Sequence, residues 1–74
     1  METCYTNLAN AIILAAAKDH RRALRRLKKY TWDKDAESVR KDCERFFRSG
    51  WFQTLTSLDG EVLIEKLHRE VYGV

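Results

Sequence analysis

Four side chains of the types that bind zinc are spread along this sequence: Cys4, His20, Cys43 and His68. Structural zinc sites take their ligands in local pairs, with only a few residues between the two members of each pair. No two of the four residues stand that close in the chain, so we expect no metal site. His20 shares its helical face with Leu24 and Leu27, and we expect it to be a half-buried histidine with one hydrogen bond.

The sequence also lacks the patterns that carry catalysis. It contains no glycine-rich phosphate loop and no Ser, His and Asp pattern of a nucleophilic hydrolase. Residues 58–61, Leu-Asp-Gly-Glu, match the start of a helix better than a calcium loop, because the alternating acids of such a loop are missing. We therefore predict a protein that is not an enzyme and that needs no cofactor.

A run of basic residues is the strongest functional signal. Residues 18–30 read KDHRRALRRLKKY. Residues 1–30 carry seven bases and two acids, a net charge of +5, whereas residues 31–74 carry seven bases and nine acids, a net charge of −2. At about 100° per helical residue, all the bases of the run fall on one side of a helix: Lys18, Arg21, Arg22, Arg25, Arg26, Lys28 and Lys29. The other side carries His20, Ala23, Leu24, Leu27 and Tyr30.

This basic face favours nucleic acid as the partner. Lys and Arg side chains neutralise phosphates and release the counterions around them, which dominates the affinity for DNA and RNA. Two alternatives remain: the face is a solvated surface with a basic bias, or it contacts an acidic protein surface. A helix that lies on an anionic membrane is disfavoured, because the apolar side is needed for the core.

Helices must position this face. The chain has no Pro and only 3 Gly, whereas all-β domains need more turn residues. The hydrophobic periodicity predicts an all-α fold, a compact bundle of about four helices in a single domain of residues 1–74. We expect a long helix capped by Thr6 or Asn7 and ending near Tyr30, then an amphipathic helix capped by Thr31 or Asp33 and ending near Arg48. A short helix over residues 51–56 and a fourth helix after Asp59 follow.

Aromatic residues near the middle of the chain are expected to anchor the core. The second helix has one apolar stripe, which consists of Trp32, Ala36, Val39, Cys43, Phe46 and Phe47. Ser49-Gly50 should end that helix, since Gly is the usual residue past a helix end. Trp51 and Phe52 follow directly, so we expect them to pack with Phe46 and Phe47.

The first half of the long helix is apolar on all sides. Tyr5, Ala9, Ile12, Ile13 and Ala16 continue the apolar stripe, and the opposite face carries Leu8, Ala11, Leu14 and Ala15. A helix that is apolar all round is buried all round. This half is therefore either the central core helix or a self-association surface, which would make the protein a homodimer.

Membrane insertion and export are not expected. Residues 8–17, LANAIILAAA, are too few to span a bilayer, which needs about 20 apolar residues, and the bases that precede the apolar part of a signal peptide are missing. The two cysteines form no local pair, which is typical of free thiols in a reducing compartment. We predict a cytoplasmic protein.

The last two helices have the rough lengths of a helix-turn-helix unit. A recognition helix should present Arg, Lys, Asn or Gln near its start, but this one begins with Asp59, Glu61 and Glu65. These acids would repel phosphate. Nucleic-acid binding is therefore expected to use the first helix.

Residues 43–67, CERFFRSGWFQTLTSLDGEVLIEKL, resemble small uncharacterised proteins of prophages and integrative elements in Gram-positive bacteria of the Firmicutes type. The similar features are Arg-Phe-Phe-Arg-Ser, Trp51-Phe52, and Leu-Asp-Gly-Glu followed by Leu63-Ile64-Glu65. The resemblance implies a mobile-element setting and assigns no functional residues. In that setting a small helical protein acts as a DNA-binding accessory or regulatory factor, or as an inhibitor of a host defence enzyme, as anti-CRISPR proteins do.

Overall fold

Four helices make up the fold. The computed structural model describes the backbone of residues 4–73 and the side chains of residues 8–73. Its elements are α1 (Cys4–Lys29), α2 (Lys34–Phe47), α3 (Gly50–Leu55) and α4 (Gly60–Tyr72), and the described residues contain no strand. The all-α prediction of a long, an amphipathic, a short and a fourth helix is confirmed. The side chains of Cys4 and Tyr5 lie outside the described part.

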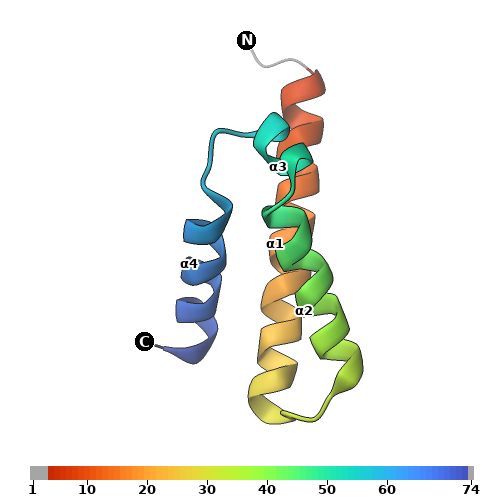
Figure 1. Cartoon of the computed structure of the whole chain (residues 1–74), viewed down its shortest axis with the longest axis vertical. Coiled ribbons are helices and arrows are strands. Elements are labelled where there is room, and N and C mark those ends of the chain that lie inside the picture. Colours follow the sequence, from red (N-terminus) through yellow and green to blue (C-terminus); the bar gives the residue numbers. More distant parts are fainter. Residues whose placement is uncertain (1–3, 74) are drawn as a thin grey trace.

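Helices α1, α2 and α4 lie side by side along the long axis of the molecule (Figure 1). The chain turns back after α1, so α2 runs antiparallel to it, and α4 runs in the same direction as α1. The short α3 lies against the N-terminal half of α1, and that half extends beyond the start of α4. The molecule measures 43 × 24 × 19 Å, and its length is set by the 26 residues of α1.

Side chains cap three of the helices. The carboxylate of Asp33 accepts a hydrogen bond from the backbone N–H of Ala36 at 3.0 Å, and the carboxylate of Asp59 accepts one from Glu61 at 2.9 Å. Asp33 was one of the two N-caps predicted for the second helix, and the fourth helix was predicted to start after Asp59. Helix α1 begins at Cys4, so the prediction that Thr6 or Asn7 caps it was wrong.

The junction between α2 and α3 also differs from the prediction. Ser49 is the N-cap of α3, where its hydroxyl accepts a hydrogen bond from Phe52 N–H at 3.2 Å. Gly50 is the first residue of α3, so it does not stop α2 with a left-handed residue. In the described chain that conformation belongs to Gly73, with φ of 73°, which caps the end of α4.

The core forms where α1, α2 and α4 meet. Its largest fully buried side chains are Phe47, Phe52, Leu24, Leu67 and His20. The rings of Phe46, Phe47 and Phe52 pack with each pair of centroids 5.6 Å apart, a spacing that favours aromatic pairs. The prediction of an aromatic core is therefore correct for these three residues.

Several predicted core residues are instead exposed. Trp51 packs edge to face on Phe46 as expected, with ring centroids 5.4 Å apart, but it is 57% exposed. Trp32 is 75% exposed, and Tyr30 and Val39 are also exposed. Tyr30 and Trp32 stack edge to face near the α1–α2 turn, beyond the end of the core. Val39 and Trp51 line the side of the α1–α2 pair that α4 does not cover. Sequence periodicity identified the apolar stripe but not how much of it the neighbouring helices cover.

Gly60 allows α4 to start against the end of α2. A Cβ atom at this position would lie 1.9 Å from the carbonyl oxygen of Phe47, which is backbone and cannot rotate away. The glycine is therefore required by close backbone approach, since its φ is not positive. This contact sets the position of α4 beside α2.

Candidate nucleic-acid interface

The seven bases of the predicted face divide into two groups. Three of them bind other parts of the chain. Arg21 donates to Glu70 of α4 at 2.6 Å, and the Lys28 ammonium donates to the carbonyl oxygen of Val71 at 3.0 Å. Arg26 forms an ion pair with Asp33 at 2.8 Å. Lys28 satisfies a carbonyl at the negative end of the α4 dipole, so these residues hold the fold together.

The other four are Lys18, Arg22, Arg25 and Lys29, which we name the basic ridge. All four are exposed, and none forms an ion pair with a residue of the described part of the chain. Their spacing of four, three and four residues keeps them within about 60° of one another around the helix and spreads them over about 16 Å. The Lys29 ammonium lies 5.6 Å from the centre of the Tyr30 ring.

The basic ridge is fixed in direction by the residues behind it. Ala23 and Leu24 are buried between α1 and its neighbours, and Ala17 and Ile13 continue this contact toward the N-terminus. Because the helix cannot rotate without exposing them, the four bases stay on the outside. The face that the sequence predicted thus exists, but it is narrower than seven residues.

The same exposed face becomes apolar toward the N-terminus. Leu8 and Leu14 are 61% and 66% exposed, and Ala11 and Ala15 are exposed as well. We name these four residues the apolar patch. The alternative that this half is a central core helix was wrong, because among its described side chains only Ala9, Ile13 and Ala17 are buried. The alternative of self-association stays a prediction.

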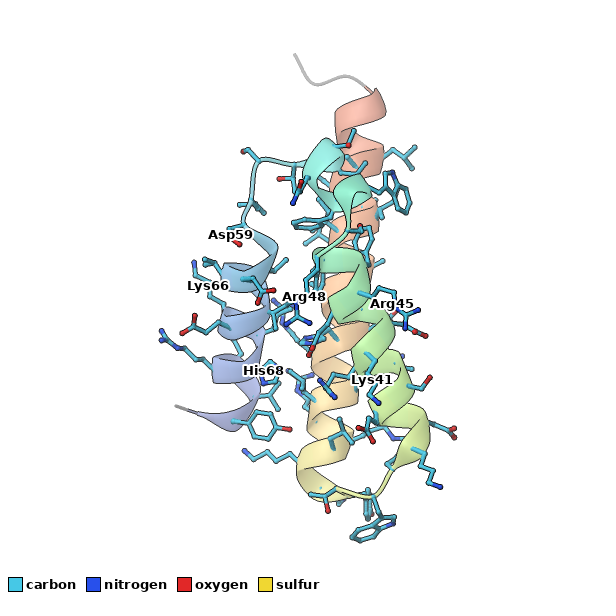
Figure 2. The ribbon with its side chains drawn as sticks, viewed as in Figure 1. Lys41, Arg45, Arg48, Asp59, Lys66 and His68 are labelled. Atoms are coloured by element: carbon cyan, nitrogen blue, oxygen red, sulfur yellow. The ribbon has the colours of Figure 1, made fainter. Side chains whose placement is uncertain are left out.

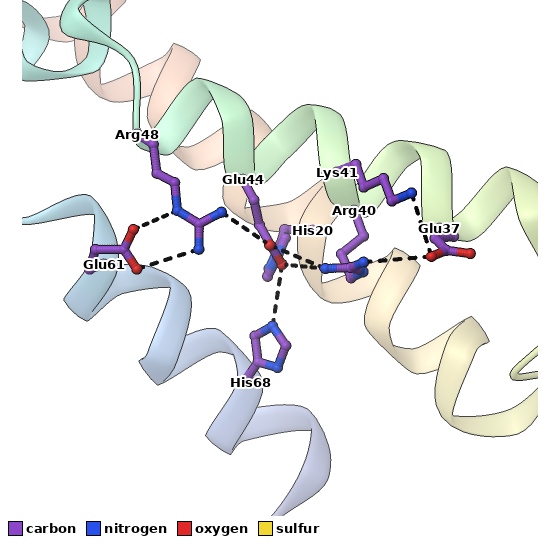
Figure 3. A network of polar contacts seen from close by, with 8 residues as sticks. All are labelled: His20, Glu37, Arg40, Lys41, Glu44, Arg48, Glu61 and His68. Atoms are coloured by element: carbon purple, nitrogen blue, oxygen red, sulfur yellow. Dashed lines mark hydrogen bonds and ion pairs between the residues drawn. The ribbon is translucent and has the colours of Figure 1, made fainter.

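A buried polar cluster lies on the opposite side of α1. Nε2 of His20 lies 3.0 Å from Glu44 Oε2, and Nε2 of His68 lies 3.3 Å from the same oxygen. Nη1 of Arg40 donates to both carboxylate oxygens of Glu44 at 3.1 Å. Figure 3 shows these groups directed at Glu44 from α1, α4 and α2. His20 has the single hydrogen bond that was expected, but it is fully buried and not half-buried.

Burial and hydrogen bonding set the protonation of this cluster. Desolvation by burial lowers the pKa of His20 and outweighs the opposite effect of Glu44. Burial opposes ionisation of Glu44, but the hydrogen bonds from His20, His68 and Arg40 outweigh it and lower the pKa of the carboxyl. His20 is therefore neutral and donates through Nε2, and Glu44 is a carboxylate that joins three helices.

Sequence reasoning missed the importance of Glu44. Glu44 lies one turn before Arg48 in the sequence, and the two side chains form an ion pair at 3.7 Å. However, Arg48 makes its closer contact with Glu61 of α4, and Glu44 is buried. The only nearby features of the sequence that point to a role for Glu44 are two arginines, Arg40 one turn before it and Arg48 one turn after it. His20 and His68, each 24 residues away, could not be paired with it from sequence.

His20, Glu44 and His68 also form the only group of metal-binding side chains among the described residues, with their ligand atoms within 4.8 Å of one another. Their chemistry does not fit a metal. Nδ1 of His20 is buried without a hydrogen-bond partner in the described structure. A metal on Nε2 would place the ring proton on Nδ1, where a metal-binding histidine normally has an acceptor. The Arg40 guanidinium also occupies both oxygens of Glu44.

Cys43 does not belong to this cluster. Cys43 is a half-buried free thiol at the α1–α2 contact, and the side chain of Cys4 lies outside the described residues. Burial, together with the nearby carboxylates of Asp19, Asp42 and Glu44, raises the pKa of the Cys43 thiol. A thiol with a raised pKa is a poor nucleophile.

The start of α4 is not available for docking in a DNA groove. Glu61 is bound to Arg48, and Gly60 packs against the backbone of Phe47. Other bases lie elsewhere on the surface: Figure 2 places Lys41 and Arg45 on α2 and Lys66 on α4. These three residues are exposed and do not belong to the basic ridge, so they provide a control of equal charge, although Lys41 pairs with Glu37 at 3.7 Å.

Comparison of the chain with protein-family models, with curated protein sequences and with solved structures found no match. None of the helices in the described part of the chain is long and apolar enough to cross a membrane.

Proposed function

We propose that this protein binds double-stranded nucleic acid through the basic ridge, without catalysis, as an accessory or regulatory factor of a mobile element in the bacterial cytoplasm. The observation that carries the proposal is the set of four exposed bases that the fold orients but does not neutralise. Ion pairs within the protein would have competed with phosphate, and the bases that form such pairs lie at the margins of the face.

The composition of the ridge indicates the kind of binding. Arg22 and Arg25, at its centre, can each hold a phosphate with two parallel N–H donors, and Lys18 and Lys29 add point charges at the ends. The ridge contains no Asn or Gln, the residues that commonly read adenine, so guanine is the base that its Arg and Lys residues could read directly. Binding should depend mainly on the phosphate backbone, and any sequence preference should be for guanine.

The number of free bases gives a quantitative test. Each neutralised phosphate contributes about −0.9 to the slope of log affinity against log salt for duplex DNA. Four contacts predict a slope of about −3.6, whereas all seven bases of the original face would give about −6.3. Fluorescence anisotropy of a labelled duplex, titrated at several salt concentrations, measures this slope.

Charge reversal of the ridge is the decisive experiment. The variant Arg22→Glu/Arg25→Glu/Lys29→Glu should lose duplex binding at low salt while its circular dichroism stays helical. The control Lys41→Glu/Arg45→Glu/Lys66→Glu changes the net charge equally on other surfaces and should keep most of the binding. Equal losses in the two variants would mean that only net charge matters, and no binding by the native protein at low salt would end the proposal.

A second candidate is a protein-binding module, such as a phage-encoded inhibitor of a host defence enzyme. The observation that favours it is the apolar patch on the same face as the basic ridge, because a protein can match an apolar and a charged half together. This candidate predicts a stoichiometric complex with one host protein in a nuclease-treated lysate. Leu14→Glu and the ridge reversal should each abolish that complex, and recovery of nucleic acid alone would exclude it.

A further inference from the structure

The apolar patch is part of a larger uncovered surface. Residues 3–17 contain no Asp, Glu, Lys or Arg. Beside the patch, an open groove of about 270 Å³ runs between α1 and the α2–α3 junction, and Ile12, Ala16, Phe46 and Trp51 form its apolar lining. The indole of Trp51 is 57% exposed there. Contiguous exposed apolar surface of this kind marks an interaction site.

The shape of the patch suits another helix. Ala11 and Ala15 lie one turn apart and have the smallest apolar side chains, so a second helix can approach to about 8 Å between axes. Leu8 and Leu14 stand on either side and can pack beside the incoming helix. Helix α4 begins below the N-terminal turns of α1 (Figure 1), and all four patch residues are exposed, so nothing in the described chain covers the patch.

The charges on the same face determine how a second copy of the chain could pack on the patch. If a second copy packed its α1 parallel to the first, the two basic ridges would face each other, and like charges repel. An antiparallel arrangement centred on the patch brings the two uncharged halves together and moves the ridges to opposite ends. We propose that the apolar patch binds the same patch of a second copy, with the two α1 helices antiparallel.

The antiparallel dimer would leave Arg22, Arg25 and Lys29 of each ridge beyond the end of the partner's α1, whereas Lys18 would lie opposite the first turns of that helix. The centre of the patch and the centre of the ridge are about 12 residues, or about 18 Å, apart along α1. The two ridges of a dimer would therefore lie about 36 Å apart. Because each ridge is on the side of its helix that faces the other copy, the two ridges point in opposite directions. One dimer should then bind two duplexes and so bridge them.

The interface is expected to be modest. Stable dimers usually bury about 1,200–2,000 Å² in total, and the patch with the adjoining groove is a small surface. We expect a dimer that dissociates on dilution. The bridging rests on the proposed nucleic-acid binding, whereas the dimer itself does not.

Analytical ultracentrifugation of the full chain tests the dimer. The sedimentation coefficient of the native protein should rise with concentration toward the dimer value. Leu14→Glu should stay monomeric and helical, and Leu8→Glu provides a second disruption of the patch. The control Val62→Glu alters an exposed apolar residue on α4 and should dimerise normally. A native protein that stays monomeric at millimolar concentration, or a Leu14→Glu variant that still dimerises, would overturn the inference.

Cross-linking tests the orientation. In a Cys4→Ser/Cys43→Ala background, Ala11→Cys and Arg25→Cys each introduce one thiol for a short bifunctional maleimide. An antiparallel dimer cross-links Ala11→Cys, which lies near the two-fold axis, and not Arg25→Cys. Efficient cross-linking of both would show a parallel dimer and refute the proposed arrangement.

Energy transfer between a donor-labelled and an acceptor-labelled duplex tests the bridging. The native protein should bring the two duplexes together, and Leu14→Glu should bind each duplex without energy transfer. If the dimer forms but no duplex binds, the proposed function and the bridging fail while the dimer stands. If duplexes bind but no dimer forms, the inference fails while the proposed function stands.

Discussion

The two faces of the second half of α1 carry polar side chains in opposite states. On the inner face, His20 is fully buried and donates to Glu44, and this carboxylate is held by groups from α2 and α4 as well. On the outer face, the basic ridge points to solvent, and none of its members forms an ion pair with a residue of the described chain. One short helical segment thus carries polar side chains that bind other parts of the protein on its inner face and bases exposed to solvent on its outer face.

The difference separates charges that the fold requires from charges that it does not. A buried carboxylate is tolerated only with its hydrogen bonds complete, so the inner cluster must be kept for folding. The ridge contributes little to folding, because exposed bases without partners stabilise a helix only slightly. Residues that folding does not require can be substituted without loss of stability, so they can serve the binding of a partner.

Removal of Glu44 should give the largest effect. Glu44→Ala leaves His20 and Arg40 without their common acceptor, and breaking a buried charge cluster in this way costs about 3–5 kcal/mol. Urea denaturation followed by circular dichroism measures the loss. Glu70→Ala, which breaks the exposed pair with Arg21, is the control and should cost about 1 kcal/mol or less. Equal costs would show that the inner cluster is no more structural than a surface pair.

Displacement of α4, which carries His68 to the cluster, should give the second-largest loss of stability. In Gly60→Ala the new Cβ would overlap the Phe47 carbonyl oxygen, so α4 must move, with a loss of about 3 kcal/mol. Gly50→Ala has open space around the same change and should be neutral or stabilising by up to about 1 kcal/mol. Thermal melts of the two variants measure this difference in stability, and similar melting temperatures would contradict the close contact at Gly60.

The fold was largely predictable because its information is local. Apolar spacing, the capping residues Asp33 and Asp59, and the absence of Pro were enough to place four helices. Trp51 and Trp32 were assigned to the core incorrectly because exposure depends on which helix covers which side. Only three helices are long enough to cover one another, and α4 covers a single side of the α1–α2 pair.

The candidate site was only partly predictable for a related reason. Helical geometry placed all seven bases on one face, but it could not show that Arg21 and Lys28 reach α4 or that Arg26 reaches Asp33. The inner cluster was missed because its members come from three helices. Contacts between distant segments are set by tertiary packing, which a single sequence does not display.

Acid should lower the stability of the protein through the inner cluster. The pKa of His20 is lowered from 6.5, so below 6.5 the unfolded chain binds a proton that the folded chain resists, and the free energy of unfolding falls as the pH falls. The pKa of Glu44 is lowered from 4.5, so its contribution is present above 4.5 and is lost at lower pH. Denaturant titrations across this range should show both declines. His20→Gln should remove the first, and an unchanged profile in that variant would exclude His20 as its source.

The smallest expected effects distinguish the bases of the same face that bind α4 from those of the basic ridge. Arg21→Ala/Lys28→Ala removes two bases that bind α4, so the free energy of unfolding should fall by about 1 kcal/mol with little change in the salt slope of duplex binding. Arg22→Ala/Arg25→Ala removes two ridge bases and should do the reverse, reducing the steepness of that slope by about 1.8 with almost no change in stability. The net charge changes equally in the two variants, so only the partners of the removed side chains differ. Identical behaviour of the two would mean that the structural division of this face has no bearing on binding.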